Sequence, residues 1–178
     1  MHPSLLPPDK LEQQCRWVFS RASGPGGQHR NKVETAATIE HIASGIRASA
    51  TEERSQQRNR QVALRRLRLA LAVEYQENSE SQAALPLASQ ETLRASELWG
   101  QYCRSGKIRI SEENEHFPAL LAEAFETLRL LDYNLAKTAE RLGTSATQLV
   151  RFFSAYAPAL SRLNAQLVAR GLSPRTAT

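Results

Sequence analysis

The chain has 178 residues, of which 41% are hydrophobic and 6% aromatic, and it carries a net charge of +5 at neutral pH. This length suits one medium domain or two small ones. No run of about 18 apolar residues predicts a membrane span, and the first residues lack the basic and apolar regions of a secretion signal. Cys15 and Cys103 do not belong to a C-x-x-C pair, so we expect buried, reduced thiols and a cytoplasmic location.

Positive charge is concentrated in one stretch of the chain. Between Arg47 and Arg68 there are seven arginines and two glutamates, so this stretch alone accounts for the net charge. Such a concentration favours an anionic partner, with nucleic acid as the first candidate. The four histidines lack the spacing of metal ligands, and neither a metal nor a small cofactor is indicated.

The first part of the chain predicts a small sheet followed by a long helix. A short helical turn is expected after Asp9. Strands are expected at 15–19, 35–42 and 46–50, the last two joined by a turn at Ser44-Gly45.

The long helix, expected at about 55–75, has two faces of different character. Leu64, Leu67 and Leu71 fall together on a helical wheel and would pack on the sheet. Four arginines lie within about 80° of one another on the opposite side, with no acid among them. They are Arg54, Arg58, Arg65 and Arg68. An ordinary solvated face is the alternative to a binding face.

The second part predicts a linker and then a helical module. Residues 77–90 are polar and contain Pro86, which is typical of a linker. A turn and a short strand are expected at 105–110. Helices are expected at 118–131, at 134–142, at 145–155 and from Pro158 to Gly171. We therefore predict domains at 1–76 and 91–178 and an α+β fold class.

Residues 135–145 have the pattern of a helix-turn-helix. Gly143 would make the turn and Ser145 would cap the second helix, so that Val150 and Phe153 face the core. In the second helix only Gln148 and Arg151 are polar side chains that could contact DNA bases, and two such residues are few for a DNA-reading motif. A helical packing module is favoured, and a DNA regulator is a remaining alternative.

The most distinctive segment is 23–32, with the sequence SGPGGQHRNK. Three glycines and one proline in four positions are incompatible with a helix interior or a central strand, so they predict a loop. The segment lacks the Lys-Ser/Thr of a phosphate loop and the glycine spacing of a dinucleotide-binding loop. A plain hairpin loop would not explain why five polar residues follow without a break.

This segment resembles the GGQ signature of class I bacterial peptide-chain release factors. The likeness continues through Ala36, His41, residues 44–46 and residues 53–60, and it covers roughly 15–71. The resemblance implies a GGQ-type sheet with a packed helix, and hydrolysis of the peptidyl-tRNA ester on the ribosome. The implied partners are the 23S rRNA at the peptidyl transferase centre, the peptidyl-tRNA, and a glutamine methyltransferase that acts on Gln28. Whether Gln28 is methylated stays open.

The resemblance also implies roles for individual residues. The catalytic residues would be Gly26, Gly27 and Gln28. Glycines permit strained backbone angles and a close approach to the tRNA 3′ end. Gln28 would donate its backbone N–H to the developing oxyanion, and its side chain would place water. Loop-shaping residues would be Gly24, Pro25 and Asn31. RNA contacts would come from His29, Arg30, Lys32, Arg54, Arg58, Arg65 and Arg68.

The sequence departs from the family at both ends. Release factors carry a codon-reading domain before the GGQ segment, whereas only 22 residues precede Ser23 here. We therefore expect codon-independent, rescue-like release, from whole ribosomes or from split large subunits. One rescue branch ends in a Lys/Arg-rich tail, but residues 170–178 contain only two arginines, so the helical module would replace it. A non-catalytic ribosome- or RNA-binding factor that retains the fold is the alternative.

Overall fold

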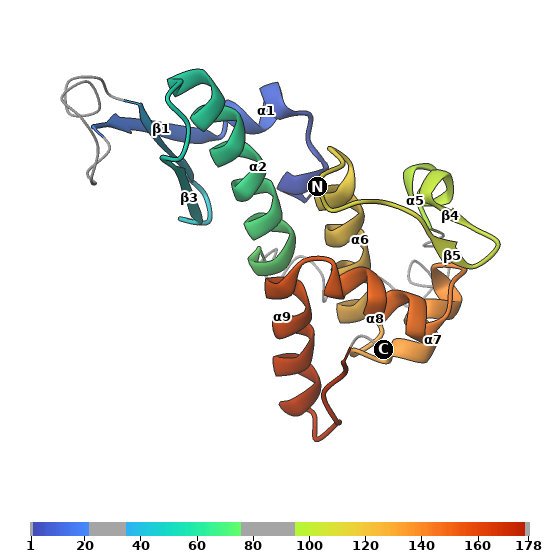
Figure 1. Cartoon of the computed structure of the whole chain (residues 1–178). Coiled ribbons are helices and arrows are strands. Elements are labelled where there is room, and N and C mark those ends of the chain that lie inside the picture. The colour runs from blue at the N-terminus through green and yellow to red at the C-terminus, as the bar shows by residue number, and fades with distance from the viewer. Residues whose placement is uncertain (1, 22–34, 76–94, 177–178) are drawn as a thin grey trace. The chain divides into compact units, whose positions relative to one another are not determined.

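The computed structural model describes residues 2–21, 35–75 and 95–176. The chain divides into two compact units, Met1–Tyr75 and Gln76–Thr178. The expected linker at 77–90 lies outside the described residues, and the domain boundaries at 76 and 91 remain predictions. The expected α+β class is confirmed, because a small sheet with a long helix is followed by several helices (Figure 1).

The first unit is built on a three-stranded antiparallel sheet in the order β1-β2-β3. Its elements are η1 (Pro3–Leu5), α1 (Pro8–Glu12), β1 (Cys15–Ser20), β2 (Ala36–His41), β3 (Arg47–Ala50) and α2 (Gln56–Glu74). The turn between β2 and β3 contains Gly45 at φ +71°, a left-handed conformation that glycine adopts without strain. Each predicted strand and the long helix are therefore confirmed within one or two residues.

One face of this sheet is covered by α2, which packs against β2 and β3 (Figure 1). Ala63, Leu67 and Leu71 of α2 are fully buried in a core that also contains Ile39 of β2 and Leu11 of α1. Full burial of one such leucine or isoleucine contributes about 1.5–3 kcal/mol. The leucine stripe of the helix therefore packs on the sheet as expected, although Leu64 is only half-buried.

The opposite face of the sheet carries a charged row across all three strands. The register pairs Arg16 with Glu40 and Glu40 with Arg47. Both arginines donate to the Glu40 carboxylate, at 2.7 Å from Arg16 Nη2 and 2.9 Å from Arg47 Nη2. These hydrogen bonds lower the pKa of Glu40. The row supports strand pairing by cross-strand contacts between opposite charges.

The second unit is mainly helical. Its elements are α5 (Glu97–Tyr102), β4 (Cys103–Arg104), β5 (Lys107–Ile108), α6 (Phe117–Leu130), α7 (Leu135–Arg141), α8 (Ala146–Ser154) and α9 (Ala157–Val168). The β4–β5 hairpin turns through Ser105 and Gly106, both at positive φ. Every residue of α6 is buried or half-buried, and Phe117, Leu121 and Leu128 are fully buried.

The turn between α7 and α8 is tied to the rest of this unit by three contacts. Trp99 Nε1 donates to the Leu142 carbonyl at 2.8 Å, and Thr144 Oγ1 donates to the Gly106 carbonyl at 2.8 Å. The thiol of Cys103 contacts the Gly143 carbonyl at 3.6 Å. Gly143 has φ +64°, and Ser145 caps α8 by accepting from Gln148 N. The helix-turn-helix predicted for 135–145 is therefore present as a structural motif.

The structure differs from the sequence predictions in one helix and in the burial of the two cysteines. Helix α5 was not predicted, because six residues are too few for a helical period; its local signal is Ser96, whose hydroxyl caps the helix by accepting from Trp99 N. Cys15 and Cys103 are free, but both are half-buried rather than buried. Cys15, the first residue of β1, packs against the core of the sheet unit but is only partly buried.

Candidate functional site

The segment 23–32 lies outside the described residues, which end at residue 21 and resume at residue 35. The roles expected for its members therefore remain predictions. They are Gly24, Pro25, Gly26, Gly27, Gln28, His29, Arg30, Asn31 and Lys32. The structure does describe the frame that holds both ends of this segment.

The two ends of the segment are held by paired strands. The last residue of β1, Ser20, is the register partner of the first residue of β2, Ala36. Arg21 therefore comes directly after β1 and Thr35 directly before β2, at the same end of the strand pair. Any residues between them begin and return at the same end of the sheet, which is the geometry that a catalytic loop on a rigid scaffold needs.

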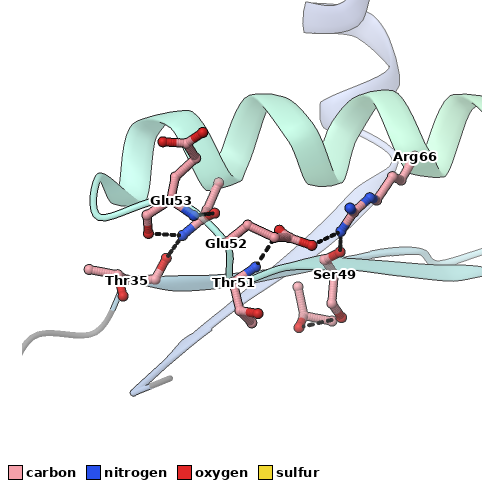
Figure 2. A network of polar contacts seen from close by, with 8 residues as sticks. Thr35, Ser49, Thr51, Glu52, Glu53 and Arg66 are labelled. Carbon is pink, nitrogen blue, oxygen red and sulfur yellow. Dashed lines mark hydrogen bonds and ion pairs between the residues drawn. The ribbon is translucent and has the colours of Figure 1, made fainter. Parts of the chain in front are cut away.

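A buried asparagine on α2 anchors the return of this segment. The side chain of Asn59 is fully buried, and its Nδ2 donates to the carbonyls of Thr35 at 2.7 Å and of Glu53 at 2.9 Å. Its Oδ1 accepts from Glu53 N at 3.0 Å. The contacts bring Thr35, at the start of β2, beside Glu53, in the connection from β3 to α2 (Figure 2).

The position of Asn59 in the helix explains its burial. It precedes Ala63 by four residues and Leu67 by eight, so it lies on the same face as the core stripe. A buried amide is tolerated there because both donors and the acceptor are satisfied. We did not single out Asn59 from the sequence, although a polar residue on the apolar face of a helix was the available signal.

A second polar contact joins β3 to α2. Arg66 Nη1 donates to the Ser49 carbonyl at 2.7 Å and lies 2.8 Å from Glu52 Oε1. Glu52 in turn accepts from Thr51 N at 2.9 Å. Hydrogen bonds from its own backbone N–H, from Arg66 and from Thr51 lower the pKa of Glu52. Figure 2 shows this contact beside the Thr35–Glu53 cluster.

The four arginines expected on one face of the helix are not equivalent. Arg54 precedes the helix, since α2 begins at Gln56 after the Ser55 cap. Arg58 and Arg65 are exposed on α2, whereas Arg68 is half-buried. Arg58 Nη1 lies 3.6 Å from Glu53 Oε2, so an acid from outside the helix reaches this face. The helix itself has no acid among these arginines, but Glu53 reaches this face from the turn before the helix.

Two other elements are tied together by Arg60. It pairs with Glu12 of α1 and lies over the ring of Trp17 on β1, 4.9 Å from its centroid. Trp17 Nε1 also donates to Glu12 at 3.3 Å. These contacts secure β1, the strand that leads into the segment at 23–32.

The far end of the β1–β2 pair is closed by His41, which is buried. Its ring nitrogens contact Ser44 Oγ at 2.8 Å and Gln14 Oε1 at 3.4 Å. Burial lowers the pKa of His41. The role of this residue in the described structure is therefore to hold the sheet, at the end opposite to the Thr35 anchor.

No group of three or more His, Cys, Asp and Glu side chains is placed to bind a metal ion in residues 2–21, 35–75 and 95–176. Over the same ranges, no helix is both long and apolar enough to span a bilayer.

Curated relatives match the part of the chain that contains this frame. The chain is 42% identical over 94 residues to the chloroplastic peptide chain release factor PrfB1 of Arabidopsis thaliana, which is 53% of this chain and 20% of that protein. It is 43% identical over 77 residues to a peptide chain release factor homolog of Escherichia coli, covering 42% and 37% of the two chains. Peptide chain release factor 1 of Frankia casuarinae is 46% identical over 70 residues, covering 39% and 20%.

The chain thus spans a fifth to somewhat over a third of the length of these relatives. The family model described as the RF-1 domain matches residues 10–114, which is more than half of the chain. This range contains the whole sheet, α2 and the segment at 23–32. The release-factor resemblance of the GGQ segment is confirmed at this level, and the chain belongs to the RF-1 domain family.

Proposed function

We propose that this protein hydrolyses the ester bond of peptidyl-tRNA on the ribosome, with Gly26, Gly27 and Gln28 as the catalytic residues. The observation that carries the proposal is the placement of the GGQ sequence between two paired strands, in a chain of the RF-1 domain family. The names of its relatives as peptide chain release factors support the same reaction.

The proposed chemistry uses the backbone more than side chains. Water attacks the ester carbonyl, and the negative charge that develops on its oxygen is stabilised by the backbone N–H of Gln28. The bond from the carbonyl carbon to the ribose oxygen of the tRNA then breaks, and that oxygen leaves as a hydroxyl with a proton from the attacking water. Loss of one such donor typically costs about 100- to 1,000-fold in rate. The Gln28 side chain orients the water, and the two glycines let the main chain approach the tRNA without a Cβ clash. The rRNA of the peptidyl transferase centre completes the site.

The frame described above supports this role by limiting the freedom of the loop ends. The Ser20–Ala36 strand pair and the Asn59 anchor hold residues on both sides of the loop. Preorganisation of this kind reduces the entropy lost when a catalytic group is positioned.

The finer part of the proposal is that release requires no stop codon. We further propose that exposed arginines of α2, such as Arg58 and Arg65, contact ribosomal phosphates, and that a glutamine methyltransferase modifies Gln28. The expected cytoplasmic location would place the protein with its ribosomes.

Peptide release from purified ribosomes tests the proposal. Ribosomes carrying a labelled peptidyl-tRNA are stalled on mRNA that lacks a stop codon, and a parallel sample has a stop codon in the decoding site. We expect equal release by the wild type from both samples. Gly27→Ala should release at least about 100-fold more slowly, because its Cβ would displace the main chain that carries the Gln28 N–H. Gln28→Ala keeps this backbone donor and should be slower because it loses the side chain that orients the water. Gln61→Ala, an exposed change on α2, is the matched control and should release normally.

Each component of the proposal can fail separately in this assay. Release only with the stop codon would refute codon independence and leave the hydrolysis intact. Binding to ribosomes without release would favour the non-catalytic binding factor. Full release by both loop variants would show that the GGQ segment is not the active element.

A further inference from the structure

The helical unit has a cationic site of its own, made by residues other than the α2 arginines. A half-open pocket of about 510 Å³ is formed between the β4–β5 hairpin and α8. Lys107, Arg109 and Arg151 line it together with Gln148, and apolar residues such as Ile108 and Phe152 complete the lining. No carboxylate is among the residues that line this pocket.

These three cations differ from several arginines of α2 in their partners. Arg58, Arg60 and Arg66 each pair with a glutamate and help hold the sheet unit together. By contrast, no carboxylate among residues 2–21, 35–75 and 95–176 forms an ion pair with the cations of the pocket. All three are exposed, so their charges are available to a ligand.

A neighbouring pocket extends the positive surface. It has a volume of about 410 Å³, shares Arg151 with the first pocket, and is lined on its other side by Arg175. The backbone of Arg175 is held by Asn164 of α9, which accepts from Arg175 N at 2.7 Å and donates to its carbonyl at 2.9 Å. Arg175, Arg151, Arg109 and Lys107 therefore line two adjoining hollows that share one arginine.

We propose that these adjoining pockets form a binding track for the phosphate backbone of RNA. RNA binding by the track is a property separate from the hydrolysis proposed for the loop. Only the identification of its natural ligand as ribosomal RNA or tRNA rests on the proposed function. Its hairpin wall lies inside the region that matches the RF-1 domain, and its α8 wall lies outside that region.

The chemistry of the track fits a regular polyanion. Guanidinium groups bind phosphate through paired N–H donors, and a succession of cations along a groove matches successive phosphates. The one aromatic ring in the first pocket, Phe152, is buried and is only 5% exposed, so it offers no platform for base stacking. Contacts are therefore made to the backbone, and binding is independent of base sequence.

The same geometry argues against the reading of DNA sequence by α8. Its two polar candidates, Gln148 and Arg151, lie in the groove beside the hairpin. Lys107 and Arg109 of the hairpin segment line the same pocket, so this face of α8 is shared with that segment rather than presented as a free recognition helix.

The test measures binding of the full chain to a fluorescent single-stranded uridine oligonucleotide over a salt series. The double variant Arg109→Gln/Arg151→Gln is compared with Lys10→Gln/Lys137→Gln, which removes the same charge at exposed positions that line neither pocket. We expect the slope of log affinity against log salt to become shallower by about 1.4 for the first variant, since each single-strand phosphate contact contributes about 0.7. The control variant should keep the wild-type slope.

Three results would overturn the proposal. One is an unchanged salt slope for Arg109→Gln/Arg151→Gln. Another is an equal decrease of the salt slope for the control Lys10→Gln/Lys137→Gln. The third is a stronger preference of the wild type for duplex DNA or polyglutamate than for the RNA. A thermal melt excludes misfolding as the cause of lost binding, because exposed substitutions of this kind typically change stability by less than about 0.5 kcal/mol. Since the assay contains no ribosomes, its result is independent of whether the loop hydrolyses peptidyl-tRNA.

Discussion

The Nδ2 atom of Asn59 lies 2.7 Å from the carbonyl oxygen of Thr35, across 24 residues of sequence. This bond joins a buried position on α2 to the residue that precedes β2. Because the same amide also holds the backbone of Glu53, one side chain fixes the start of β2 and the connection from β3 to the helix.

Asn59→Ala should destabilise the fold by at least about 2 kcal/mol, because three backbone groups lose their partner and each unsatisfied buried group costs about 1–3 kcal/mol. Asn59→Asp should be at least as harmful, since a carboxylate cannot donate to the Thr35 and Glu53 carbonyls. Urea unfolding followed by circular dichroism measures both. The exposed control Gln61→Ala should stay within about 0.5 kcal/mol of the wild type, and a similarly small effect of Asn59→Ala would contradict the anchoring role.

The stability of the sheet unit should fall in mild acid because of His41. Burial lowers the pKa of this residue below its ordinary value of 6.5, so the unfolded chain takes up the proton at a higher pH than the folded protein does. The stabilisation is therefore complete above about pH 6.5 and is lost as the pH falls toward the lower folded pKa. Unfolding free energies at pH 7.5 and pH 5 should differ less for His41→Gln than for the wild type. An identical pH dependence for the two proteins would rule this out.

Cys15 should react slowly with alkylating reagents while the protein is folded. Burial, with a smaller effect of the nearby Glu12 carboxylate, raises the pKa of the Cys15 thiol from 9.0 to about 11. At pH 9 the reactive thiolate fraction is thus about 50-fold smaller in the folded protein than in the unfolded chain. Iodoacetamide labelling with and without urea, read at Cys15 by peptide mass spectrometry, checks this. Equal rates in the two conditions would be the contrary result.

The stability of the fold should respond in opposite ways to alanine at two glycines of the helical unit. Gly143 has φ +64° in the turn between α7 and α8, so Gly143→Ala should cost about 1 kcal/mol even though no atom obstructs the new Cβ. Gly100 lies within α5 with open space around it, so Gly100→Ala should stabilise by about 0.5–1 kcal/mol. Urea unfolding of the two variants gives the comparison, and changes of the same sign would refute the assignment of these two conformations.

Much of the fold followed from local patterns in the sequence. The strands found at 15–20, 36–41 and 47–50 were predicted at 15–19, 35–42 and 46–50, from β-forming residues and from a glycine turn. Helix α2 was predicted from its leucine period, and the structure adds that Ser55 caps its start. The short helix α5 was missed because six residues do not complete two helical turns.

The candidate site was predictable from the sequence only where its residues are neighbours along the chain. The GGQ segment is contiguous, so its residue types could be recognised without a structure, and its catalytic role stays a prediction. The partners of the arginines could not be predicted from a helical wheel, because Glu12, Glu52 and Glu53 come from outside α2.

By itself the sequence determined most of the secondary structure, the α+β class and the family, since each depends on residues that are neighbours along the chain. Only the tertiary structure decided that Asn59 anchors Thr35, that arginines such as Arg60 and Arg66 are engaged by glutamates, and that Lys107, Arg109 and Arg151 share one pocket. These relationships join residues that are distant in sequence. They arise when the apolar faces of helices and strands are buried against one another, and that packing determines which polar groups meet.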